Sequence, residues 1–241
     1  MPSIVTNVVV LNQETHRKLR VHAQPAASLG DNQRFVAVMV GEFATLALTY
    51  PLLFSKEADT GRFYCGAMLG FDANENLFLE AQRGFEAHRP LNLQRGPFYT
   101  SGSDLAIDLA HPRVGASGDT ALFDDGGEPS AYLKSIIGLM NDLKVGAERT
   151  RQFIDTLLAL KLLEPMTMNA SFDDGSKRAI TGLYTVNPES LRGLPDDKAV
   201  ELFRRGYLQL IYLQLASLNH VATLVRKKNV GFLNAGSSAR G

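Results

Sequence analysis

MTMNASFDDGSKRAITGLYTVN, residues 166–187, is the stretch of sequence that decides the fold class. Apolar and polar side chains alternate over residues 166–172, the run DDGS at residues 173–176 is a turn signal, and the alternation returns over residues 180–186. A period of two on both sides of a short turn is typical of two antiparallel strands. The stretch therefore predicts a β-hairpin in the second half of the chain.

Apolar helices are predicted on both sides of this hairpin. Residues 130–163 carry apolar side chains at intervals of three and four, and Pro165 ends the pattern. Residues 207–228 repeat this spacing, and a basic cluster at residues 226–228 suits the C-terminal end of a helix dipole. We therefore expect two long helices around the hairpin, followed by a flexible tail at residues 230–241.

The first 125 residues show a different pattern of apolar and polar side chains. Short apolar or alternating runs are separated by turn signals, at intervals too short for crossover helices, so the sheet should be mostly antiparallel or mixed. The predicted fold class is α+β, with a strand-rich portion at residues 1–125 packed against a helical portion at residues 126–229; a single compact domain is the alternative. The first portion holds 10 basic and 14 acidic side chains, whereas residues 126–241 hold 15 and 11, so the portions can attract each other.

Residues 35–54 (FVAVMVGEFATLALTYPLLF) form the one stretch apolar enough to resemble a membrane span. Glu42 lies near its centre, where a charge costs about 2.5–3.5 kcal/mol on insertion scales. We therefore expect a buried strand that runs into a short helix, and no stable membrane insertion. Residues 1–7 contain no Lys or Arg, so export by the general secretory route is not expected and the predicted location is the cytoplasm.

The overall composition argues against several classes of protein. The 241 residues include 25 basic and 25 acidic side chains, a balance that disfavours a dedicated nucleic-acid binder. Cys65 is the one cysteine, which rules out an internal disulfide and a zinc site built from cysteines, and its apolar neighbours predict a buried thiol. The motifs of phosphate loops, dinucleotide sites, nucleophile elbows and zinc proteases are missing. We expect no cofactor and no metal.

Charged side chains near two proline-containing turns are the candidates for a ligand site. Arg95 precedes a Gly-Pro turn, and Asp108, His111 and Arg113 cluster around a His-Pro turn. An arginine can clamp a carboxylate or phosphate with two hydrogen bonds, and Asp108 with His111 can carry protons. The alternative is structural, because arginines in such turns often bind loop carbonyls and carboxylates often lie on the solvent side of a strand.

Two other features point to a protein partner. His16 and Arg20 belong to a basic cluster that can meet an acidic partner, although an exposed loop and strand edge explain them as well. The apolar faces of the two long helices can pack on each other or be offered to another chain. We expect a protein partner, with a homodimer as one form of it, and no nucleic acid.

Several short segments also occur in an order and spacing that resemble a known family. In the first half they are LN (11–12), LRV (19–21), ALTYP (47–51), DTGRF (59–63), LGF (69–71), ENLFL (75–79) and PR (112–113). In the second half they are FID (153–155), LLEP (162–165), GLYT (182–185), GYL (206–208) and LASL (215–218). Together, over residues 8–229, they resemble the bacterial SapC family. The peptide-transport permease and the saposin that share this name differ, because a permease needs several apolar spans and a saposin several cysteines.

The resemblance implies an accessory role, because the family is named after a gene associated with the export of surface-layer proteins. It supplies no catalytic residue. We therefore predict a non-enzymatic accessory or interaction protein that handles surface-layer proteins or peptides. The alternative is an enzyme or small-ligand sensor with a site in the N-terminal half, built from Arg95, Asp108, His111 and Arg113.

Overall fold

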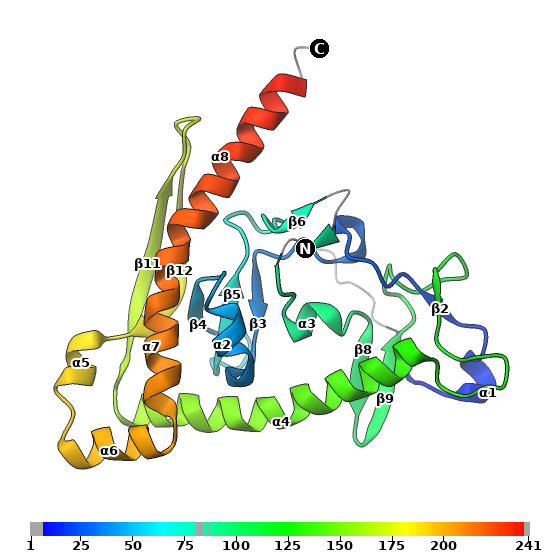
Figure 1. Ribbon diagram of the computed structural model, residues 1–241, viewed down its shortest axis with the longest axis horizontal. Coiled ribbons are helices and arrows are strands. Elements are labelled where there is room, and N and C mark those ends of the chain that lie inside the picture. Colours follow the sequence, from blue (N-terminus) through cyan, green and yellow to red (C-terminus); the bar gives the residue numbers. More distant parts are fainter. Residues whose placement is uncertain (1–6, 81–83, 86, 239–241) are drawn as a thin grey trace. The chain divides into compact units, whose positions relative to one another are not determined.

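The computed structural model describes residues 7–80, 84–85 and 87–238 (Figure 1). The chain folds into two compact units, each of which combines two separate stretches of sequence. Unit 1 contains Met1–Asn32 and Leu79–Val145, and unit 2 contains Gln33–Phe78 and Gly146–Gly241. These units interleave along the chain, whereas the sequence had suggested portions that meet near residue 125. The predicted α+β class is confirmed.

Unit 1 is built from short antiparallel strands and short helical turns. Its central strand is β9 (Asp104–Asp108), which pairs with β1 (Val8–Val10) and β8 (Phe98–Ser101). The helix α1 (Gln13–His16) begins where the side chain of Asn12 accepts hydrogen bonds from two backbone N–H groups. The other elements are β2 (Arg20–Val21) paired with β10 (Thr120–Ala121), β6 (Leu79–Glu80) paired with β7 (Gly84–Phe85), η1 (Ala27–Leu29), α3 (Leu91–Gln94) and the first part of α4 (Ala131–Ala159).

A five-stranded antiparallel sheet forms the centre of unit 2, in the order β11-β12-β4-β5-β3. The predicted hairpin of residues 166–187 is confirmed as its β11–β12 pair, with a register shift between Met166 and Met168. The hairpin joins strands that are distant in sequence, because Leu183 and Tyr184 of β12 pair with β4. The strands are β3 (Phe35–Ala37), β4 (Leu52–Lys56), β5 (Phe63–Met68), β11 (Leu163–Ser171) and β12 (Lys177–Val186).

Helices pack on one face of this sheet around an aromatic cluster. The ring of Phe153 in α4 meets the rings of Phe43, Phe54 and Tyr207, with ring centres 6.2, 6.3 and 5.1 Å away. Aromatic rings bury large apolar areas, so this cluster fixes α4 against the sheet. The other helical segments of unit 2 are η2 (Val40–Glu42), α2 (Phe43–Leu46), α5 (Pro188–Arg192), α6 (Asp196–Arg204), α7 (Tyr207–Ser217), η3 (Leu218–His220) and α8 (Val221–Ser238).

The apolar stretch at residues 35–54 lies in the core of unit 2. It forms β3, the short helical turns η2 and α2, and the start of β4, as the sequence predicted. Glu42 is buried, and its carboxylate accepts a hydrogen bond from the backbone N–H of Met39 at 2.8 Å. The charge that argued against membrane insertion therefore caps the first helical turn of this stretch.

Polar side chains fix the helix that begins at Tyr207 to the sheet. The buried Gln214 donates a hydrogen bond to the carbonyl oxygen of Leu52 at 2.9 Å, and Ser217 Oγ accepts one from the N–H of Leu52 at 2.9 Å. By length and composition alone, Tyr207–Phe232 is also a helix that can cross a membrane. Its buried hydrogen bonds to β4 place the first part of it in the core of unit 2.

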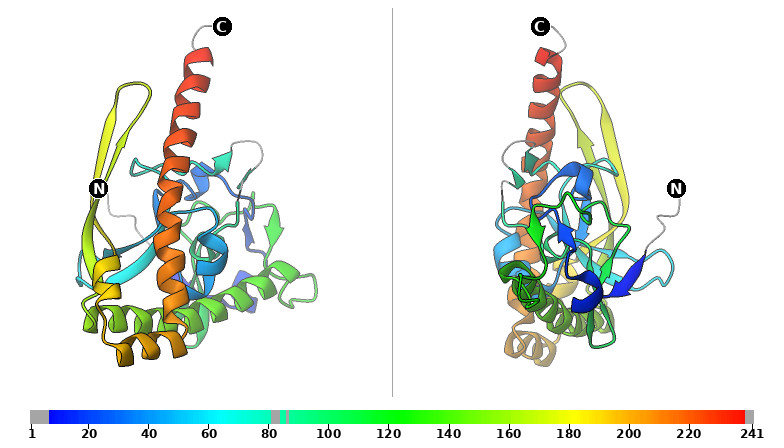
Figure 2. Two further views of the ribbon diagram at one scale, coloured as in Figure 1. Left: turned by 60° about the vertical axis from the view of Figure 1, so that its left-hand side comes forward. Right: turned by 90° about the vertical axis from the view of Figure 1, so that its right-hand side faces the viewer.

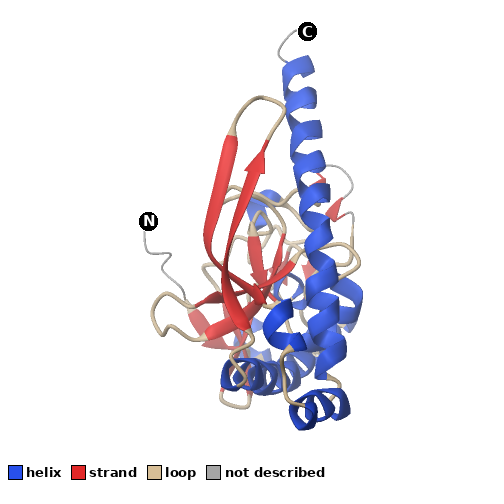
Figure 3. Ribbon diagram, turned by 90° about the vertical axis from the view of Figure 1, so that its left-hand side faces the viewer, coloured by secondary structure: helices blue, strands red, loops and turns tan. Residues whose placement is uncertain are grey.

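The helix α8 lies beside the β11–β12 hairpin (Figures 2 and 3). The ring of Phe172, next to the hairpin turn, lies 6.0 Å from the ring of Phe232 in α8 and 5.0 Å from that of Phe71. The structure continues α8 to Ser238 over residues for which the sequence predicts a flexible tail, and the flexibility of this segment stays a prediction. Residues 239–241 lie outside the described residues.

Candidate functional site

Arg113 is the centre of a buried polar cluster in unit 1. Its guanidinium forms an ion pair with Asp31, and the two side chains are 3% and 2% exposed. It also donates hydrogen bonds to the carbonyl oxygens of His22 at 2.7 Å and Gln24 at 3.0 Å. Arg113 therefore holds a loop of backbone in place, which is the structural role weighed for it from the sequence.

Arg89 is a second arginine at the same carboxylate, and the sequence alone predicts no role for Arg89 or Asp31. Its Nη2 lies 3.5 Å from Asp31 and donates a hydrogen bond to the carbonyl oxygen of Leu93 at 2.8 Å. Its Nε is buried and has no hydrogen-bond partner among the described residues. Burial lowers the pKa of Arg89 and raises the pKa of the Tyr132 phenol. No local motif marks this cluster, because its members come from distant parts of the chain.

Arg95 and Asp108 are also bound by groups of unit 1. The Arg95 guanidinium donates a hydrogen bond to the carbonyl oxygen of Phe98 at 2.8 Å and stacks 4.4 Å from the centre of the Tyr99 ring. The Asp108 carboxylate accepts hydrogen bonds from the backbone N–H groups of Asn7 at 2.8 Å and Ala110 at 3.0 Å. Both side chains thus stabilise the turns that flank β8 and β9.

His111 completes the set of predicted ligand residues and lies close to the others. Its Nδ1 accepts a hydrogen bond from the backbone N–H of Arg113 at 3.1 Å. Burial, followed by the positive charge of Arg113, lowers the pKa of His111, while Asp108 opposes this shift. The structure therefore gathers Arg95, Asp108, His111 and Arg113 in unit 1, and their role in ligand binding stays a prediction.

The two residues predicted to meet a partner also make internal contacts in unit 1. His16 Nδ1 accepts a hydrogen bond from the N–H of Asn12 at 3.0 Å. Arg20 donates hydrogen bonds to the carbonyl oxygens of Gly118 at 2.7 Å and Asp119 at 2.8 Å. These contacts tie the N-terminal segment to the loop before β10, and the partner-binding role stays a prediction.

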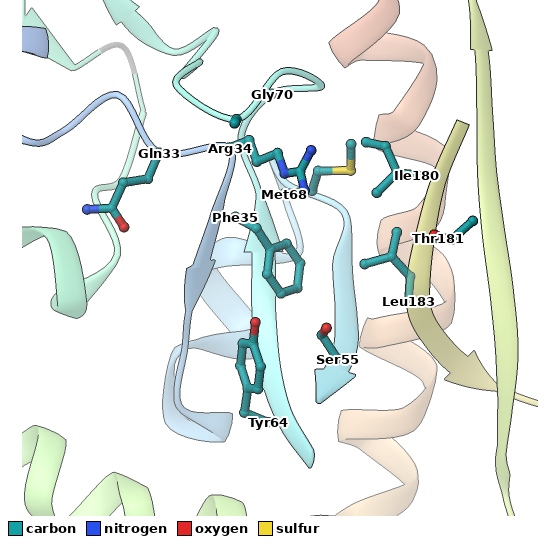
Figure 4. A pocket seen from close by; sticks show the side chains of 11 residues that line it. Gln33, Arg34, Phe35, Ser55, Tyr64, Met68, Gly70, Ile180, Thr181 and Leu183 are labelled. Carbon is teal, nitrogen blue, oxygen red and sulfur yellow. The ribbon is translucent and has the colours of Figure 1, made fainter. Parts of the chain in front are cut away.

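A pocket of about 400 Å³ opens on the sheet of unit 2 (Figure 4). Successive side chains of a strand point to opposite faces, and Phe54 points to Phe153 of α4, so Ser55 points to the other face. Ser55 pairs with Tyr64 of β5 and with Leu183 of β12, which places these three side chains together. The pocket therefore lies on the face of the sheet opposite to α4.

Apolar and polar side chains both line this sheet pocket, and the apolar part is built around Phe35. The ring of Phe35 lies directly over Gly66, where an added Cβ would be 2.2 Å from Phe35 Cε1. Only a glycine leaves room for the ring in this position. The rings of Phe35 and Tyr64 meet edge to face with centres 5.9 Å apart. The remaining apolar side chains of the lining are Met68, Ala73, Ile180 and Leu183.

Two polar groups of the sheet pocket keep donors that the fold does not use. The exposed Arg34 guanidinium donates one hydrogen bond, to the carbonyl oxygen of Phe71 at 3.4 Å, and no other within the described part of the chain. The Tyr64 hydroxyl makes no hydrogen bond to any residue that the structure describes. By contrast, the Ser55 hydroxyl donates to the carbonyl oxygen of Gly182 at 3.0 Å. None of the described residues that line the pocket is acidic.

The acidic residues next to the sheet pocket are already paired. Glu75 lies behind Gly70 of the lining and binds Lys228. Asp72 binds Arg178 Nε and Lys228 Nζ, each at 2.7 Å, and these hydrogen bonds lower the pKa of the Asp72 carboxyl. Because two cations neutralise two carboxylates here, the charge of Arg34 is left without a counterion from this cluster.

A second concavity of about 620 Å³ lies in unit 2 against α4. Its rim charges are paired, since Arg62 lies 3.3 Å from Glu57 and Arg151 lies 3.0 Å from Asp155. Cys65 lines this concavity and is buried, as the sequence predicted, and its burial raises the pKa of the thiol. The concavity is therefore largely apolar with a neutral rim.

Large apolar side chains are exposed on the elements around α7. Leu48 in the turn after α2 is 73% exposed, Phe203 of α6 is 72% exposed, and Tyr212 of α7 is 58% exposed. Both α2 and α6 pack against α7, and the ring of His220 in η3 lies 3.1 Å from the carbonyl oxygen of Ala47 beside Leu48. We refer to Leu48, Phe203 and Tyr212 as the α7 apolar surface.

Comparisons with known proteins identify the family and leave its chemistry open. The described residues contain no group of three or more His, Cys, Asp or Glu side chains that could hold a metal ion. No curated protein and no solved structure matches the chain. The family model described as SapC matches residues 11–224, which is most of the sequence and includes strands and helices of both units. The chain therefore belongs to the SapC family.

Proposed function

We propose that the protein is an accessory protein that binds another polypeptide through the α7 apolar surface. The observation that carries this proposal is the exposure of Leu48, Phe203 and Tyr212, which are 73%, 72% and 58% exposed. A single exposed leucine needs no explanation, but a group of large apolar side chains on neighbouring elements is typical of a binding surface. Tyr and Phe are also enriched in protein interfaces.

The helix beneath this surface supports the same proposal. Residues Tyr207–Phe232 contain no Asp or Glu, and 22% of an 18-residue apolar window within them is buried. Leu208 and Leu215 lie one turn before and one turn after Tyr212, on the same side of the helix, and both are half-buried. The exposed tyrosine therefore continues into apolar surface, which gives a partner more area to cover.

The resemblance stated from the sequence motivates the choice of partner. Because that resemblance implies a link to the export of surface-layer proteins, we propose that the partner is a surface-layer or other exported polypeptide met in the cytoplasm. Such a chain exposes apolar segments before it folds, and these segments suit an apolar surface on an accessory protein. Fractionation of the native host should recover the protein with the cytoplasmic fraction, and recovery with washed membranes would contradict the location.

Site-specific photo-cross-linking in the native host tests the binding surface. A photoreactive phenylalanine analogue at position 203 or 212 should give a discrete cross-linked product with the same polypeptide, to be identified by mass spectrometry. Val145 of α4 is 55% exposed and belongs to unit 1, so the analogue at position 145 is the matched control. The same products from all three positions, or none from positions 203 and 212, would overturn the proposal.

A pair of substitutions tests the same surface without a photoreactive analogue at position 203 or 212. Phe203→Ser combined with Tyr212→Ser removes apolar area that is already in water, so the free energy of unfolding should change by less than about 0.5 kcal/mol for each substitution. For this test the photoreactive analogue is placed at position 48. Its cross-link to the partner should disappear in the double variant, whereas Val145→Ser should leave the cross-link intact. Persistence of the cross-link in the double variant would show that the partner binds elsewhere.

A further inference from the structure

We propose that the sheet pocket of unit 2 binds a small carboxylic acid with an aromatic or branched aliphatic body. This proposal is independent of the α7 apolar surface. It places the carboxylate at Arg34 and the body against the Phe35 ring. No residue of the set predicted from the sequence takes part in it, because those residues all belong to unit 1.

The charge of the pocket selects an anion. Arg34 is the one charged residue among the described lining. Within the described residues its guanidinium makes one long hydrogen bond, of 3.4 Å to a backbone carbonyl. The neighbouring Asp72 and Glu75 are bound by Arg178 and Lys228. A guanidinium offers paired donors that match the two oxygens of a carboxylate, and its charge strengthens each hydrogen bond.

The shape of the pocket selects the rest of the ligand. A volume of about 400 Å³ falls within the range of small-molecule sites and limits the ligand to a small body. Figure 4 shows the Phe35 and Tyr64 rings on one side of the pocket and Ile180 and Leu183 on the other, with Met68 between Arg34 and Ile180. A flat ring or a branched chain fills this space and buries apolar area on both sides.

Tyr64 adds a point of orientation. Its hydroxyl has no partner within the described residues, and in Figure 4 it lies at the opposite end of the Phe35 ring from Arg34. A ligand acceptor at that end, such as a hydroxyl or carbonyl oxygen, can take its hydrogen bond. The larger concavity against α4 lacks this polarity, because Arg62 and Arg151 on its rim are already paired with carboxylates.

Isothermal titration calorimetry with the full chain and a matched set of probes tests the proposal. The probes are 3-phenylpropanoate, its neutral amide 3-phenylpropanamide, the cation 3-phenylpropylamine, and acetate, which keeps the charge without the ring. We expect 3-phenylpropanoate to bind with a Kd of about 1 mM or tighter, as the size of such a ligand allows. The amide, the amine and acetate should each bind at least about tenfold more weakly.

Two arginine variants locate the binding. Arg34→Gln should weaken 3-phenylpropanoate at least about tenfold and leave binding of the amide unchanged, because only the charge-assisted hydrogen bonds are lost. Arg62→Gln removes an exposed arginine charge from the rim of the other concavity. This variant should leave the Kd of 3-phenylpropanoate unchanged. Tyr64→Phe should leave the Kd of 3-phenylpropanoate unchanged. It should weaken the binding of 3-(4-hydroxyphenyl)propanoate, a probe that carries an oxygen on the ring. Circular dichroism checks that every variant is folded.

Several outcomes would overturn the proposal. One is equal affinity for 3-phenylpropanoate and its amide, which would show that the charge of Arg34 plays no part. Another is an equal loss of affinity in Arg34→Gln and Arg62→Gln, which would show attraction by general positive charge. Failure of every acid to bind at concentrations well above 1 mM would exclude this ligand class. None of these results bears on the cross-links from positions 203 and 212, so the two proposals fail separately.

Discussion

Arg113 in unit 1 and Arg34 in unit 2 show two different uses of the same side chain. Arg113 is 3% exposed, and its guanidinium donates hydrogen bonds to Asp31 and to the carbonyl oxygens of His22 and Gln24. Arg34 is exposed, and its guanidinium makes one hydrogen bond, of 3.4 Å, to the residues that the structure describes. A buried arginine needs partners from its own chain, because an unpaired buried charge is costly. An arginine with unused donors at a pocket is available to a ligand.

The difference teaches which polar residues to test for stability and which to test for binding. The charged groups that the sequence singled out lie where turns meet, and in unit 1 they hold those turns together. Arg34 and Tyr64, whose side chains keep unused donors within the described part of the chain, lie at the sheet pocket of unit 2. Substitutions in the first set should therefore lower stability, and substitutions in the second should lower affinity and leave stability unchanged.

The largest effect is expected for Asp31→Ala. This substitution leaves Arg113 and Arg89 without their shared carboxylate in the interior of unit 1. Removing one partner of a buried ion pair costs about 3–5 kcal/mol. Urea unfolding followed by circular dichroism should show this loss, and hydrogen exchange should rise in peptides from unit 1.

Asp104→Ala is the matched control for this prediction. Asp104 is exposed at the start of β9, and within the described residues its carboxylate accepts one hydrogen bond, at 3.4 Å from the hydroxyl of the neighbouring Ser103. The control should cost less than about 0.5 kcal/mol, as is usual for surface substitutions. Equal losses for Asp31→Ala and Asp104→Ala would break the comparison, because Arg113 would then not depend on its ion pair and could serve a ligand.

The next largest effect is expected for Gln214→Leu in unit 2. The buried Gln214 amide donates to the carbonyl oxygen of Leu52 at 2.9 Å, and its oxygen accepts a hydrogen bond from the N–H of Val186 at 3.3 Å. Leucine leaves these backbone groups buried and unpaired, at a cost of about 1–3 kcal/mol in the free energy of unfolding. Gln209→Leu, on the exposed side of the same helix, should cost less than about 0.5 kcal/mol.

This second pair sharpens the comparison within unit 2. Gln214 is a polar residue used by the fold, whereas Arg34 is one that the fold leaves free. Arg34→Gln should therefore unfold at the same urea concentration as the unmodified chain. A loss of stability in Arg34→Gln as large as that in Gln214→Leu would assign Arg34 to the fold and remove the basis for a ligand there.

The elements that local periodicity could predict are those with long and regular patterns. The hairpin of residues 166–187 and the two helices around it follow directly from periods of two and of three to four. The interleaving of the units does not follow from such patterns, because the pairing of β12 with β4 joins residues more than a hundred positions apart. The extension of α8 to Ser238 does not follow from them either, since the contact between Phe172 and Phe232 joins residues 60 positions apart.

The composition of the candidate sites is even harder to predict from local sequence patterns than the fold. Arg95, Asp108, His111 and Arg113 were chosen because they are close in sequence to proline turns, and the structure does bring them together. Asp31, which binds Arg113, carries no local signal. Arg34 and Tyr64 lie in stretches whose sequence pattern predicts a strand and nothing more. The register of β3, β5 and β12 brings these stretches together around one pocket.

The smallest effect is expected from the titration of His111. Burial and the charge of Arg113 lower the pKa of His111 below its ordinary value of 6.5, so the unfolded chain takes up this proton more readily than the folded chain. The contribution to stability is therefore complete above pH 6.5 and is lost as the pH falls toward the lowered pKa. In His111→Gln the difference in unfolding free energy between about pH 7.5 and about pH 5 should be smaller than in the unmodified chain. The same pH dependence in His111→Gln and in the unmodified chain would mean that adding a charge beside Arg113 costs nothing, which a buried structural cluster does not allow.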